Sequence, residues 1–345
     1  MKILHIINNL SRNGGAQRFV IDLVTNVRVA SETKILIVER ENDFVETLNS
    51  IGVDVLIWCE MSLKQKISLI FWPSVVHSHL FPSCYLALLF FKSKKIQTEH
   101  NSHNRRRDYF FLKPFEWLMY NFHDKTVCIS HKVKEQLSIY VKIDNSKLEV
   151  IYNGVDLERF SSDFREFPKD NSRLYIGMAG RLHEYKDQET LILAMKLIPK
   201  NYHLLLAGEG DQFSRLKELV NINHLNDRVT FLGLVSNVPE FLSKLHIYIQ
   251  SSKIEGFGLA VVEAMASRVP VLGSRVPGLD EVIGSNEYLF ELGDEEEIYI
   301  KLMRIFSSRS KFKQASIYSH NRSIQFELNK FISSYENLYC ELSNV

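Results

Sequence analysis

Short apolar runs alternate with amphipathic stretches along the whole chain. Most of these runs are nearly continuously apolar, which is typical of parallel strands covered on both faces. In the first half we expect strands at 3–7, 34–38, 53–57, 75–78, 96–99, 126–129 and 148–151. In the second half we expect them at 174–179, 203–207, 229–232, 247–250, 269–272 and 288–290. This alternation of strands with helical segments such as 187–198 and 213–220 predicts an α/β fold built from doubly wound open sheets.

A polar, charged stretch at 156–172 has no apolar period and lies between two predicted strands. It divides the chain into two halves of similar size, so we expect one domain at 1–160 and another at 161–325. The remaining segment, 326–345, has a helical spacing of apolar residues at Phe331, Tyr335, Leu338 and Leu342. This helix is expected either to cap the second domain or to pack back across the first.

The composition is that of a soluble globular protein, with 45% hydrophobic and 24% charged residues among 345. No apolar run approaches the roughly 18 residues of a membrane span, and MKILHIINNL at the start is interpreted as a buried strand and not as a signal peptide.

The net charge is +1, with 20 Lys and Arg against 15 Asp and Glu in residues 1–155. This mild basic excess suggests an anionic partner for the first half, but the lack of a basic stripe argues against nucleic acid. The four scattered cysteines have no metal-binding spacing.

The strongest candidate site is the segment SSKIEGFGLAVVEAMA at 251–266, which follows the strand at 247–250. Gly256 and Gly258 bring the backbone round into a helix that begins near Leu259. The unpaired N–H groups at such a helix start suit a phosphate. Glu263 lies about one turn into the helix, where it can accept hydrogen bonds from ribose hydroxyls. The alternative is an amphipathic helix with a solvated Glu263 and a turn residue at Glu255.

Two further loops follow predicted strands. In GMAGRLHEYKD at 177–187, Arg181 and Lys186 lie at the carboxyl end of a strand, where open α/β sheets bind ligands. Two fixed cations there would hold a diphosphate and stabilise it as it leaves, although surface charge before a helix is the alternative. Asn13-Gly14-Gly15 follows the first strand, and its paired glycines allow close approach of the backbone to a ligand, or form a plain turn.

Histidines end two predicted strands of the first half. They are His77 and His79 in VVHSH and His100 in TEHN. A lone histidine is more often structural than catalytic, but a position at a strand's carboxyl end raises the odds of a functional role. These residues form no convincing metal-binding spacing, and the chain has no Asp-x-Asp metal–diphosphate motif. We therefore expect a metal-independent mechanism without a cofactor.

Two segments of the first half combine aromatic, apolar and basic residues, LALLFFKSKK at 86–95 and RRRDYFFLKPFEWLMY at 105–120. This composition favours contact with an anionic membrane surface or a lipid-linked acceptor. Two buried helices with solvated cationic ends are the alternative interpretation.

Taken together, these segments resemble the family-4 glycosyltransferases. Glu255 and Glu263 match that family's Glu-x7-Glu signature. The resemblance also covers GGAQRF near the start and, in the family's order, VIYNGVDLERF at 150–160, GRLHEYKD at 180–187, LLLAGEGD at 204–211, RVTFLGLVSNVPEFL at 228–242 and PVLGSRVPGLDEVI at 270–283. One departure is Gln17, where the family often has Glu, which puts the role of that side chain in doubt.

The resemblance implies roles for single residues. Arg181 and Lys186 would bind the donor diphosphate, and Glu263 the nucleotide ribose. Glu255 would contact the transferred sugar. The other implied donor contacts are the backbone of Gly256, Phe257, Gly258 and Leu259, the glycines Gly14 and Gly15, and Val235 in the nucleobase-lining segment 234–238. His100 matches the family's active-site histidine, and the implied catalytic set is Glu255, His100, Arg181 and Lys186.

The resemblance also implies the GT-B architecture and its chemistry. Two Rossmann-like doubly wound domains would face a central cleft, with the donor on the second, the acceptor on the first, and a C-terminal helix returning to the first. The implied activity is a retaining transfer from a nucleotide-diphosphate sugar, with UDP favoured over GDP, to a glycan or polyprenyl-linked acceptor. Family habit points to bacterial surface polysaccharide, O-antigen or capsule, made in the cytoplasm or at the cytoplasmic face of the inner membrane. A GT-B sugar-nucleotide 2-epimerase and a non-catalytic nucleotide-sugar-binding partner are the alternatives.

Overall fold

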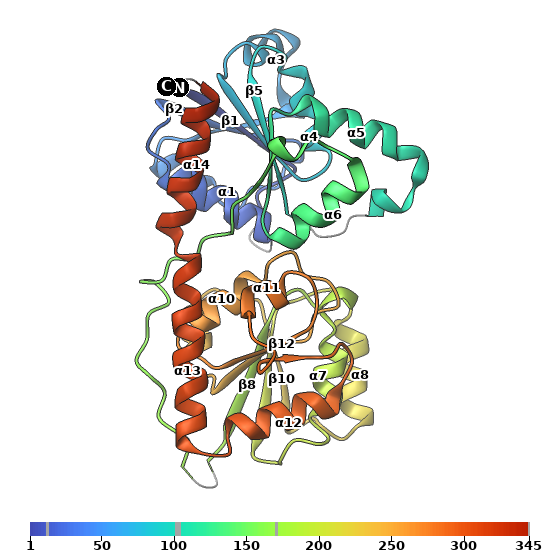
Figure 1. Cartoon of the computed structure of the whole chain (residues 1–345), viewed down its shortest axis with the longest axis vertical. Coiled ribbons are helices and arrows are strands. Elements are labelled where there is room, and N and C mark those ends of the chain that lie inside the picture. The colour runs from blue at the N-terminus through green and yellow to red at the C-terminus, as the bar shows by residue number, and fades with distance from the viewer. Residues whose placement is uncertain (12–13, 101–104, 170–171, 344–345) are drawn as a thin grey trace. The chain divides into compact units, whose positions relative to one another are not determined.

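The chain forms two α/β units in the computed structural model, which describes residues 1–345 except 12–13, 101–104, 170–171 and 344–345 (Figure 1). The N-terminal unit comprises Met1–Gly154 together with Asn329–Val345, and the C-terminal unit comprises Val155–Leu328. Each unit has its own parallel sheet with helices packed against it. The predicted α/β fold with two doubly wound sheets is confirmed.

The N-terminal sheet has the strand order β3-β2-β1-β4-β5-β6-β7 and is parallel throughout the described chain. Its strands are β1 Lys2–Ile7, β2 Glu32–Ile37, β3 Asp54–Ile57, β4 Val75–His79, β5 Lys94–Glu99, β6 Lys125–Cys128 and β7 Leu148–Val150. Its helices are α1 Gly15–Asn26, α2 Val45–Ser50, α3 Leu63–Ile70, α4 Ser83–Leu86, α5 Lys113–Phe122, α6 His131–Val141 and α14 Leu328–Ser343. The strand order reverses direction between β1 and β4, which is where open sheets of this kind bind ligands.

The C-terminal sheet has the order β10-β9-β8-β11-β12-β13 and is also parallel. Its strands are β8 Leu174–Ala179, β9 Tyr202–Ala207, β10 Val229–Gly233, β11 Ile247–Gln250, β12 Val271–Ser274 and β13 Leu289–Phe290. Its helices are α7 Gln188–Ala194, α8 Phe213–Ile222, α9 Val238–Ser243, α10 Leu259–Ala266, α11 Leu279–Ile283, α12 Glu295–Ile305 and α13 Arg309–Ser323. Here the reversal lies between β8 and β11. All the predicted strands are present, with ends that differ by at most two residues.

The two faces of the N-terminal sheet are filled differently. Leu4 and Ile6 of β1 join a core with Leu36, Leu69 and Phe90 on one face. Because side chains alternate along a strand, His5 points to the opposite face, where its ring lies 6.4 Å from that of Tyr339 of α14. This second face therefore buries polar rings beneath a helix that comes from the other end of the chain.

The C-terminal helix α14 packs on the N-terminal unit, so the second of the two predicted placements is confirmed (Figure 1). Phe331 and Tyr335 are buried, and the Phe331 ring lies 5.0 Å from Phe19 of α1. The Glu336 carboxylate accepts a hydrogen bond from the Arg28 backbone at 2.6 Å. Of the apolar stripe predicted from spacing alone, Phe331, Tyr335 and Leu338 are buried and Leu342 is half-buried.

The boundaries between the units differ from those predicted at 160/161 and 325/326. The chain crosses between units at Gly154/Val155 and again at Leu328/Asn329. Val155 donates to the Phe326 carbonyl at 2.8 Å and accepts from the Leu328 N–H at 3.0 Å. The two crossing segments are thus held together by backbone hydrogen bonds, which a polar composition does not reveal.

Candidate donor-binding and active site

The loop between β11 and α10 carries Glu255 and closes as the sequence predicts. Gly258 is the N-cap of α10 with a φ of 97°, and a Cβ at this position would lie 2.7 Å from Leu279 Cδ2. Glycine is therefore required both by the backbone conformation and by the space. Phe257 is buried against Phe326 at 5.2 Å, which anchors the loop. The helix begins at Leu259, so its first N–H groups lie directly after the glycines.

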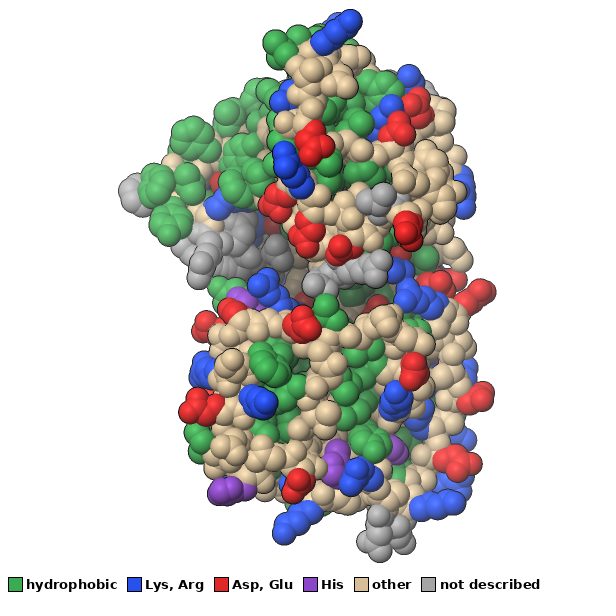
Figure 2. Space-filling view, turned by 180° about the vertical axis from the view of Figure 1, so that it is seen from behind, with side chains coloured by type: hydrophobic (Ala, Val, Ile, Leu, Met, Phe, Trp, Pro, Cys, Tyr) green, Lys and Arg blue, Asp and Glu red, His purple; other side chains and the backbone are tan. Residues whose placement is uncertain are grey.

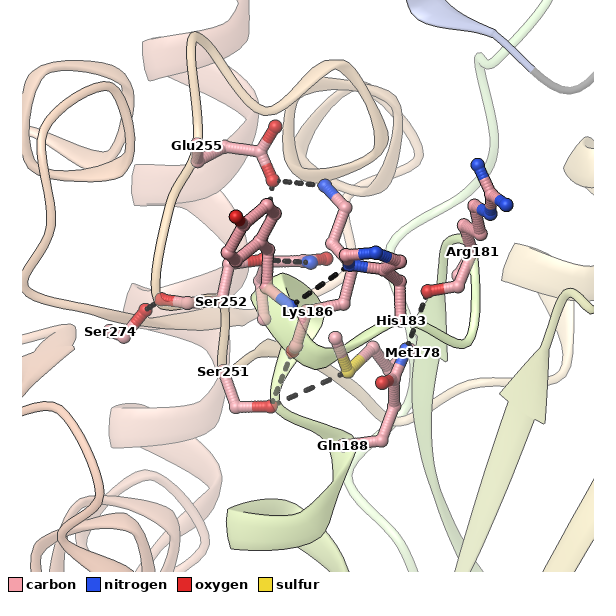
Figure 3. Close-up of polar contacts among 12 residues, drawn as sticks. Met178, Arg181, His183, Lys186, Gln188, Ser251, Ser252, Glu255 and Ser274 are labelled. Atoms are coloured by element: carbon pink, nitrogen blue, oxygen red, sulfur yellow. Dashed lines mark hydrogen bonds and ion pairs between the residues drawn. The ribbon is translucent and has the colours of Figure 1, made fainter. Parts of the chain in front are cut away.

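Lys186 and Glu255 are brought together from positions 69 residues apart. Lys186 Nζ lies 2.5 Å from Glu255 Oε2, and Figure 3 shows the two side chains pointing toward one another. Ser252 Oγ donates to the same carboxylate oxygen at 3.2 Å. The pair is partly buried, with side-chain exposures of 26% for Lys186 and 15% for Glu255. Its geometry holds a cation and a carboxylate ready for a ligand that carries both phosphate and hydroxyl groups.

A series of hydrogen-bonded side chains that begins on β11 supports the carboxylate of Glu255. Tyr248 Oη donates to Gln250 Oε1 at 2.8 Å, and Gln250 Nε2 donates to Ser252 Oγ at 2.8 Å. Burial raises the pKa of Tyr248, so its hydroxyl stays a donor at neutral pH. Tyr248, Gln250 and Ser252 are all buried, and their spacing of two places them on one side of an extended chain. Ser252 lies in the segment predicted from the sequence, whereas Tyr248 and Gln250 were not predicted as site residues, although polar side chains at alternate positions of a buried strand mark them.

Arg181 lies on the loop that follows β8, with its side chain exposed. Its backbone carbonyl accepts from Gln188 Nε2 at 3.0 Å, and the neighbouring Leu182 N–H donates to the Glu209 carbonyl at 2.9 Å. These bonds fix the loop, while the guanidinium itself has no hydrogen bond or ion pair among the described residues. Figure 3 shows it on the far side of Lys186 from Glu255. The loop thus presents a cation that no described residue pairs with.

Glu263 and Val235 lie where the sequence predicts them. Glu263 is half-buried on α10, and Val235 is half-buried in the segment between β10 and α9. Their contacts with a nucleotide remain predictions.

The glycine loop after β1 is braced from inside the N-terminal unit. Gly14 caps α1, and a Cβ there would lie 1.7 Å from Gln17 Oε1. Gln17 is buried and donates to Asn9 Oδ1 at 2.9 Å. The side chain that departs from the family pattern therefore packs against this loop. Gly15 is exposed as the first residue of α1, whereas Asn13 lies outside the described residues.

A cavity of about 300 Å³ opens within the N-terminal unit at the carboxyl ends of its central strands. It is lined by Asn8, Leu80, Phe81, Gln97, Thr98, Glu99, His100 and Arg106. His100 is the one predicted site residue in this lining. The Gln97 side chain is 2% exposed, and its Oε1 has no hydrogen-bond partner in the part of the chain that the structure describes. A buried acceptor on a cavity wall is suited to a ligand hydroxyl or amide.

Two carboxylates beside this cavity are paired with arginines. Arg107 Nη2 lies 3.4 Å from Glu99 Oε2, and Arg106 Nε lies 3.1 Å from Glu116 Oε1. Tyr120 donates to Glu99, and its pKa is raised by burial and by that carboxylate. Arg106 and Arg107 therefore turn inward, which corrects the prediction that this segment offers them as cations to a membrane.

Comparisons with known proteins agree along nearly the whole chain. Residues 13–159 match the family model described as "Glycosyltransferase Family 4", and residues 160–322 match "Glycosyl transferases group 1". The chain belongs to the family-4 glycosyltransferases.

Relatives and solved structures of this glycosyltransferase are consistent with the assignment. The "O-antigen biosynthesis glycosyltransferase WclY" of Escherichia coli is 24% identical over 99% of both chains. The "N-acetyl-alpha-D-glucosaminyl L-malate synthase" of Bacillus anthracis is 29% identical over 64% of this chain and 60% of its own length. The crystal structure of Anabaena HepE in complex with UDP superimposes with a TM-score of 0.86 at 18% identity, covering 99% of this chain and all of that one. The fold is therefore GT-B, as the resemblance implied.

An exposed aromatic surface lies along α5 of the glycosyltransferase. Figure 2 shows hydrophobic side chains gathered on this flank of the N-terminal unit. Its members are 45–61% exposed, and we define it as Tyr109, Phe115, Trp117, Leu118 and Phe122, with Lys113 exposed beside them. The interpretation of 105–120 as a buried helix with solvated ends is therefore wrong for these side chains.

The second aromatic–basic segment of the glycosyltransferase, 86–95, is not one helix. α4 ends at Leu86, and Lys94 begins β5. Phe90 and Lys95 are buried, whereas Phe91 is 64% exposed and its ring lies 5.7 Å from that of Phe71. Lys92 Nζ lies 4.9 Å from the Phe71 ring. In this segment, therefore, only the turn at Phe91 and Lys92 places apolar and cationic side chains together at the surface.

Three histidines of the glycosyltransferase come close enough for one metal ion. Ring nitrogens of His5, His77 and His79 lie within 4.8 Å of one another. Both His77 nitrogens are already hydrogen-bonded, to Tyr339 Oη and Thr98 Oγ1 at 2.7 Å each. The spacing within the sequence gave no sign of this group because His5 comes from a different strand. Metal independence of the reaction stays a prediction.

Proposed function

We propose that the protein is a retaining glycosyltransferase that moves a hexosyl or N-acetylhexosaminyl group from a nucleotide-diphosphate donor. A UDP-sugar is the favoured donor. The observation that carries the proposal is the Lys186–Glu255 pair on the loops that follow β8 and β11, with the exposed Arg181, whose guanidinium has no partner among the described residues, on the same β8 loop. Solved structures of HepE that contain UDP and UDP-glucose support the choice of nucleotide. Relatives named for O-antigen synthesis support surface polysaccharide as the product.

The donor diphosphate would lie against Arg181, Lys186 and the first N–H groups of α10. As the bond from the anomeric carbon to the phosphate oxygen breaks, negative charge grows on that oxygen. Preorganised cations and N–H groups stabilise this charge most in the transition state, where rate is gained. The acceptor hydroxyl attacks from the same face and gives its proton to the leaving phosphate oxygen. Retention therefore requires neither a separate protein base nor a metal ion.

Glu255 and Glu263 would bind hydroxyl groups. The carboxylate of Glu255 is held by Ser252 and Lys186, so it can accept from hydroxyls of the transferred sugar without moving far. Glu263 would accept from the ribose, with Val235 beside the base. The backbone of Gly256, Phe257 and Gly258 would complete the sugar site.

The acceptor would bind in the cavity of the N-terminal unit. Gln97 offers a buried amide oxygen, and Phe81 is 52% exposed with Arg106 4.3 Å from its ring. Glu99 and Arg106 already have partners of opposite charge. An aromatic face, amides and neutralised charges suit an uncharged sugar ring, as in a glycan or polyprenyl-linked acceptor.

The aromatic surface would touch an anionic membrane, and we propose the cytoplasmic face of the inner membrane. No described helix is long and apolar enough to span a bilayer. The surface contact would therefore rest on aromatic side chains at the lipid interface and on Lys113 and Lys92.

The transferase proposal is tested with a panel of UDP-, GDP-, ADP- and CMP-sugars. Donor binding and slow donor hydrolysis are measured for wild type and Glu263→Ala, and the released sugar is followed by NMR. We expect one nucleotide class to bind and its sugar to be released with retained configuration by wild type only. Release of the inverted sugar would refute retention, and no binding at millimolar concentration would refute the donor assignment.

The membrane proposal is tested with the full chain and vesicles of phosphatidylcholine with or without phosphatidylglycerol. We expect sedimentation with the anionic vesicles at low salt, reduced by Phe115→Ser and Trp117→Ser. Ile222→Ser is the matched control, because Ile222 is 65% exposed on α8 of the other unit. Equal binding by all three variants, or none by wild type, would contradict the proposal.

A further inference from the structure

Three histidine rings form a hydrogen-bonded chain that ends at the cavity of the N-terminal unit. His5 Nδ1 lies 3.2 Å from His79 Nε2, and His79 Nδ1 lies 3.3 Å from His100 Nε2. The sheet register produces this chain. His77 and His79 are two residues apart and so share a face, and His5 pairs with His77 across β1 and β4.

All three rings of the chain are buried. His5 is 2% exposed, His79 is 0% exposed and His100 is 9% exposed. The Phe19 ring of α1 packs edge-on against His79 at 5.4 Å and His100 at 4.8 Å. Burial lowers the pKa values of His5 and His100 to about 3. The rings are therefore neutral at pH 7, and each carries one N–H.

Counting these protons leaves two arrangements. Three neutral rings hold three protons, and two of them lie in the two hydrogen bonds. The third lies either on His100 Nδ1, at the cavity end, or on His5 Nε2, at the inner end. His79 is the sole hydrogen-bond partner of the His5 ring among the described residues. An N–H at the inner end would thus have no acceptor among the described residues, whereas an N–H on His100 faces the cavity, where water or a ligand can accept it.

We propose that His79, anchored by His5, is a positioning residue that holds His100 as a neutral donor with its N–H on Nδ1. His100 lines the cavity, and its Nε2 is engaged by His79, so Nδ1 is the nitrogen left for a ligand. It then donates to a substrate hydroxyl and takes up no proton during turnover. This inference rests on the proposed function, in which the acceptor binds in the cavity that His100 lines.

His77 and His79 have different hydrogen-bond partners. The His77 ring centroid lies 4.1 Å from that of His79, but its nitrogens bond to Tyr339 and Thr98. His77 therefore ties α14 to the sheet, and of these two histidines only His79 is hydrogen-bonded to His100 among the described residues.

Two amide substitutions at His79 separate its two hydrogen bonds. An asparagine amide takes the place of Nδ1, so His79→Asn keeps the bond to His100 and loses the bond to His5. A glutamine amide takes the place of Nε2, so His79→Gln does the reverse. Both variants leave one neutral amide in the same packed site, so their melting temperatures serve as a matched control for folding.

We expect His79→Gln to lower kcat by on the order of 10- to 100-fold, the usual effect of removing the orienting partner of a functional histidine, with little change in donor KM. His79→Asn should lose several-fold less kcat than His79→Gln, since the bond that orients His100 is retained. Equal losses in the two variants at equal melting temperature would overturn the positioning role.

The tautomer is measured independently of activity. Long-range ¹H–¹⁵N correlation on wild type labelled at histidine, with His100 assigned by His100→Gln, should show a neutral ring protonated on Nδ1. Protonation on Nε2 would overturn the inference. If wild type turned over no nucleotide-sugar, the proposed function would fail, while this spectrum would still decide the state of His100.

Discussion

Arg181 is the residue whose removal best separates catalysis from stability. Its side chain is exposed and has no hydrogen bond or ion pair among the described residues. Arg181→Gln therefore leaves no charge without its partner, and its effect on the free energy of unfolding should stay within about 0.5 kcal/mol. Lys186 offers no such separation, because its loss would leave Glu255 without its cation.

The expected catalytic cost follows from the charges around the diphosphate. Lys186 shares its charge with Glu255 at 2.5 Å, whereas Arg181 brings a positive charge that nothing in the described chain offsets. A unit charge about 4 Å from a phosphate oxygen contributes roughly 4 kcal/mol at an effective dielectric constant of about 20. Removal of one preorganised oxyanion donor costs about 3–4 kcal/mol in other enzymes. We therefore expect a barrier higher by about 2–4 kcal/mol, a rate loss of roughly 30- to 900-fold.

The assay is release of the nucleoside diphosphate from the donor identified by the sugar-nucleotide panel, with thermal melting measured in parallel. Arg181→Lys keeps the charge and should recover part of the rate. Arg309→Gln is the matched control, since Arg309 is an exposed arginine at the start of α13 in the same unit. If Arg181→Gln keeps turnover within a few-fold of wild type at an unchanged melting temperature, the diphosphate role is wrong.

Three further predictions concern the supports of the two sites. Gln250→Leu removes the middle of the hydrogen-bonded series Tyr248–Gln250–Ser252 that supports Glu255. The kcat should therefore fall about 10-fold and the free energy of unfolding by roughly 1–3 kcal/mol, as measured by donor hydrolysis and urea unfolding. An unchanged kcat would show that Glu255 needs no such support. Gly258→Ala introduces a Cβ 2.7 Å from Leu279 at a positive φ, and should cost about 1–3 kcal/mol in urea unfolding; a fully stable variant would contradict the strain argument. Burial lowers the folded-state pKa values of His5 and His100 to about 3 and of His123 to about 4. The unfolded chain binds more protons below pH 6.5, so stability should fall by on the order of 1 kcal/mol per histidine between pH 7 and 5.5; a flat or rising profile would contradict burial in the neutral form.

Much of the fold followed from local patterns. Each strand was visible as an apolar run because a parallel strand is buried on both faces, and this requirement acts on every residue of the strand. The start of α10 at Leu259 was predictable because Gly258 must adopt a positive φ there. Where a boundary depended on pairing between distant segments, as at Val155 with Phe326, composition pointed six residues too late.

Part of the site was equally visible. Arg181, Lys186 and Glu255 stood out because each follows a strand, and the carboxyl ends of parallel strands meet at one edge of the sheet. The pattern could not tell that Lys186 and Glu255 form an ion pair, while Arg181 has none with any described residue. The inward turn of Arg106 toward Glu116 was hidden in the same way, since a basic run looks the same whether or not a buried carboxylate lies beside it.

The sequence by itself thus determined the alternating α/β architecture, the family and the loops that carry the donor site, because these depend on residue types at short spacing. Tertiary structure alone decided which charges are neutralised, that α14 covers the N-terminal sheet, and that His5 joins His79 and His100 in one chain. Those contacts arise from the register of strands and the return of a distant helix, and neither leaves a periodic signal in the chain.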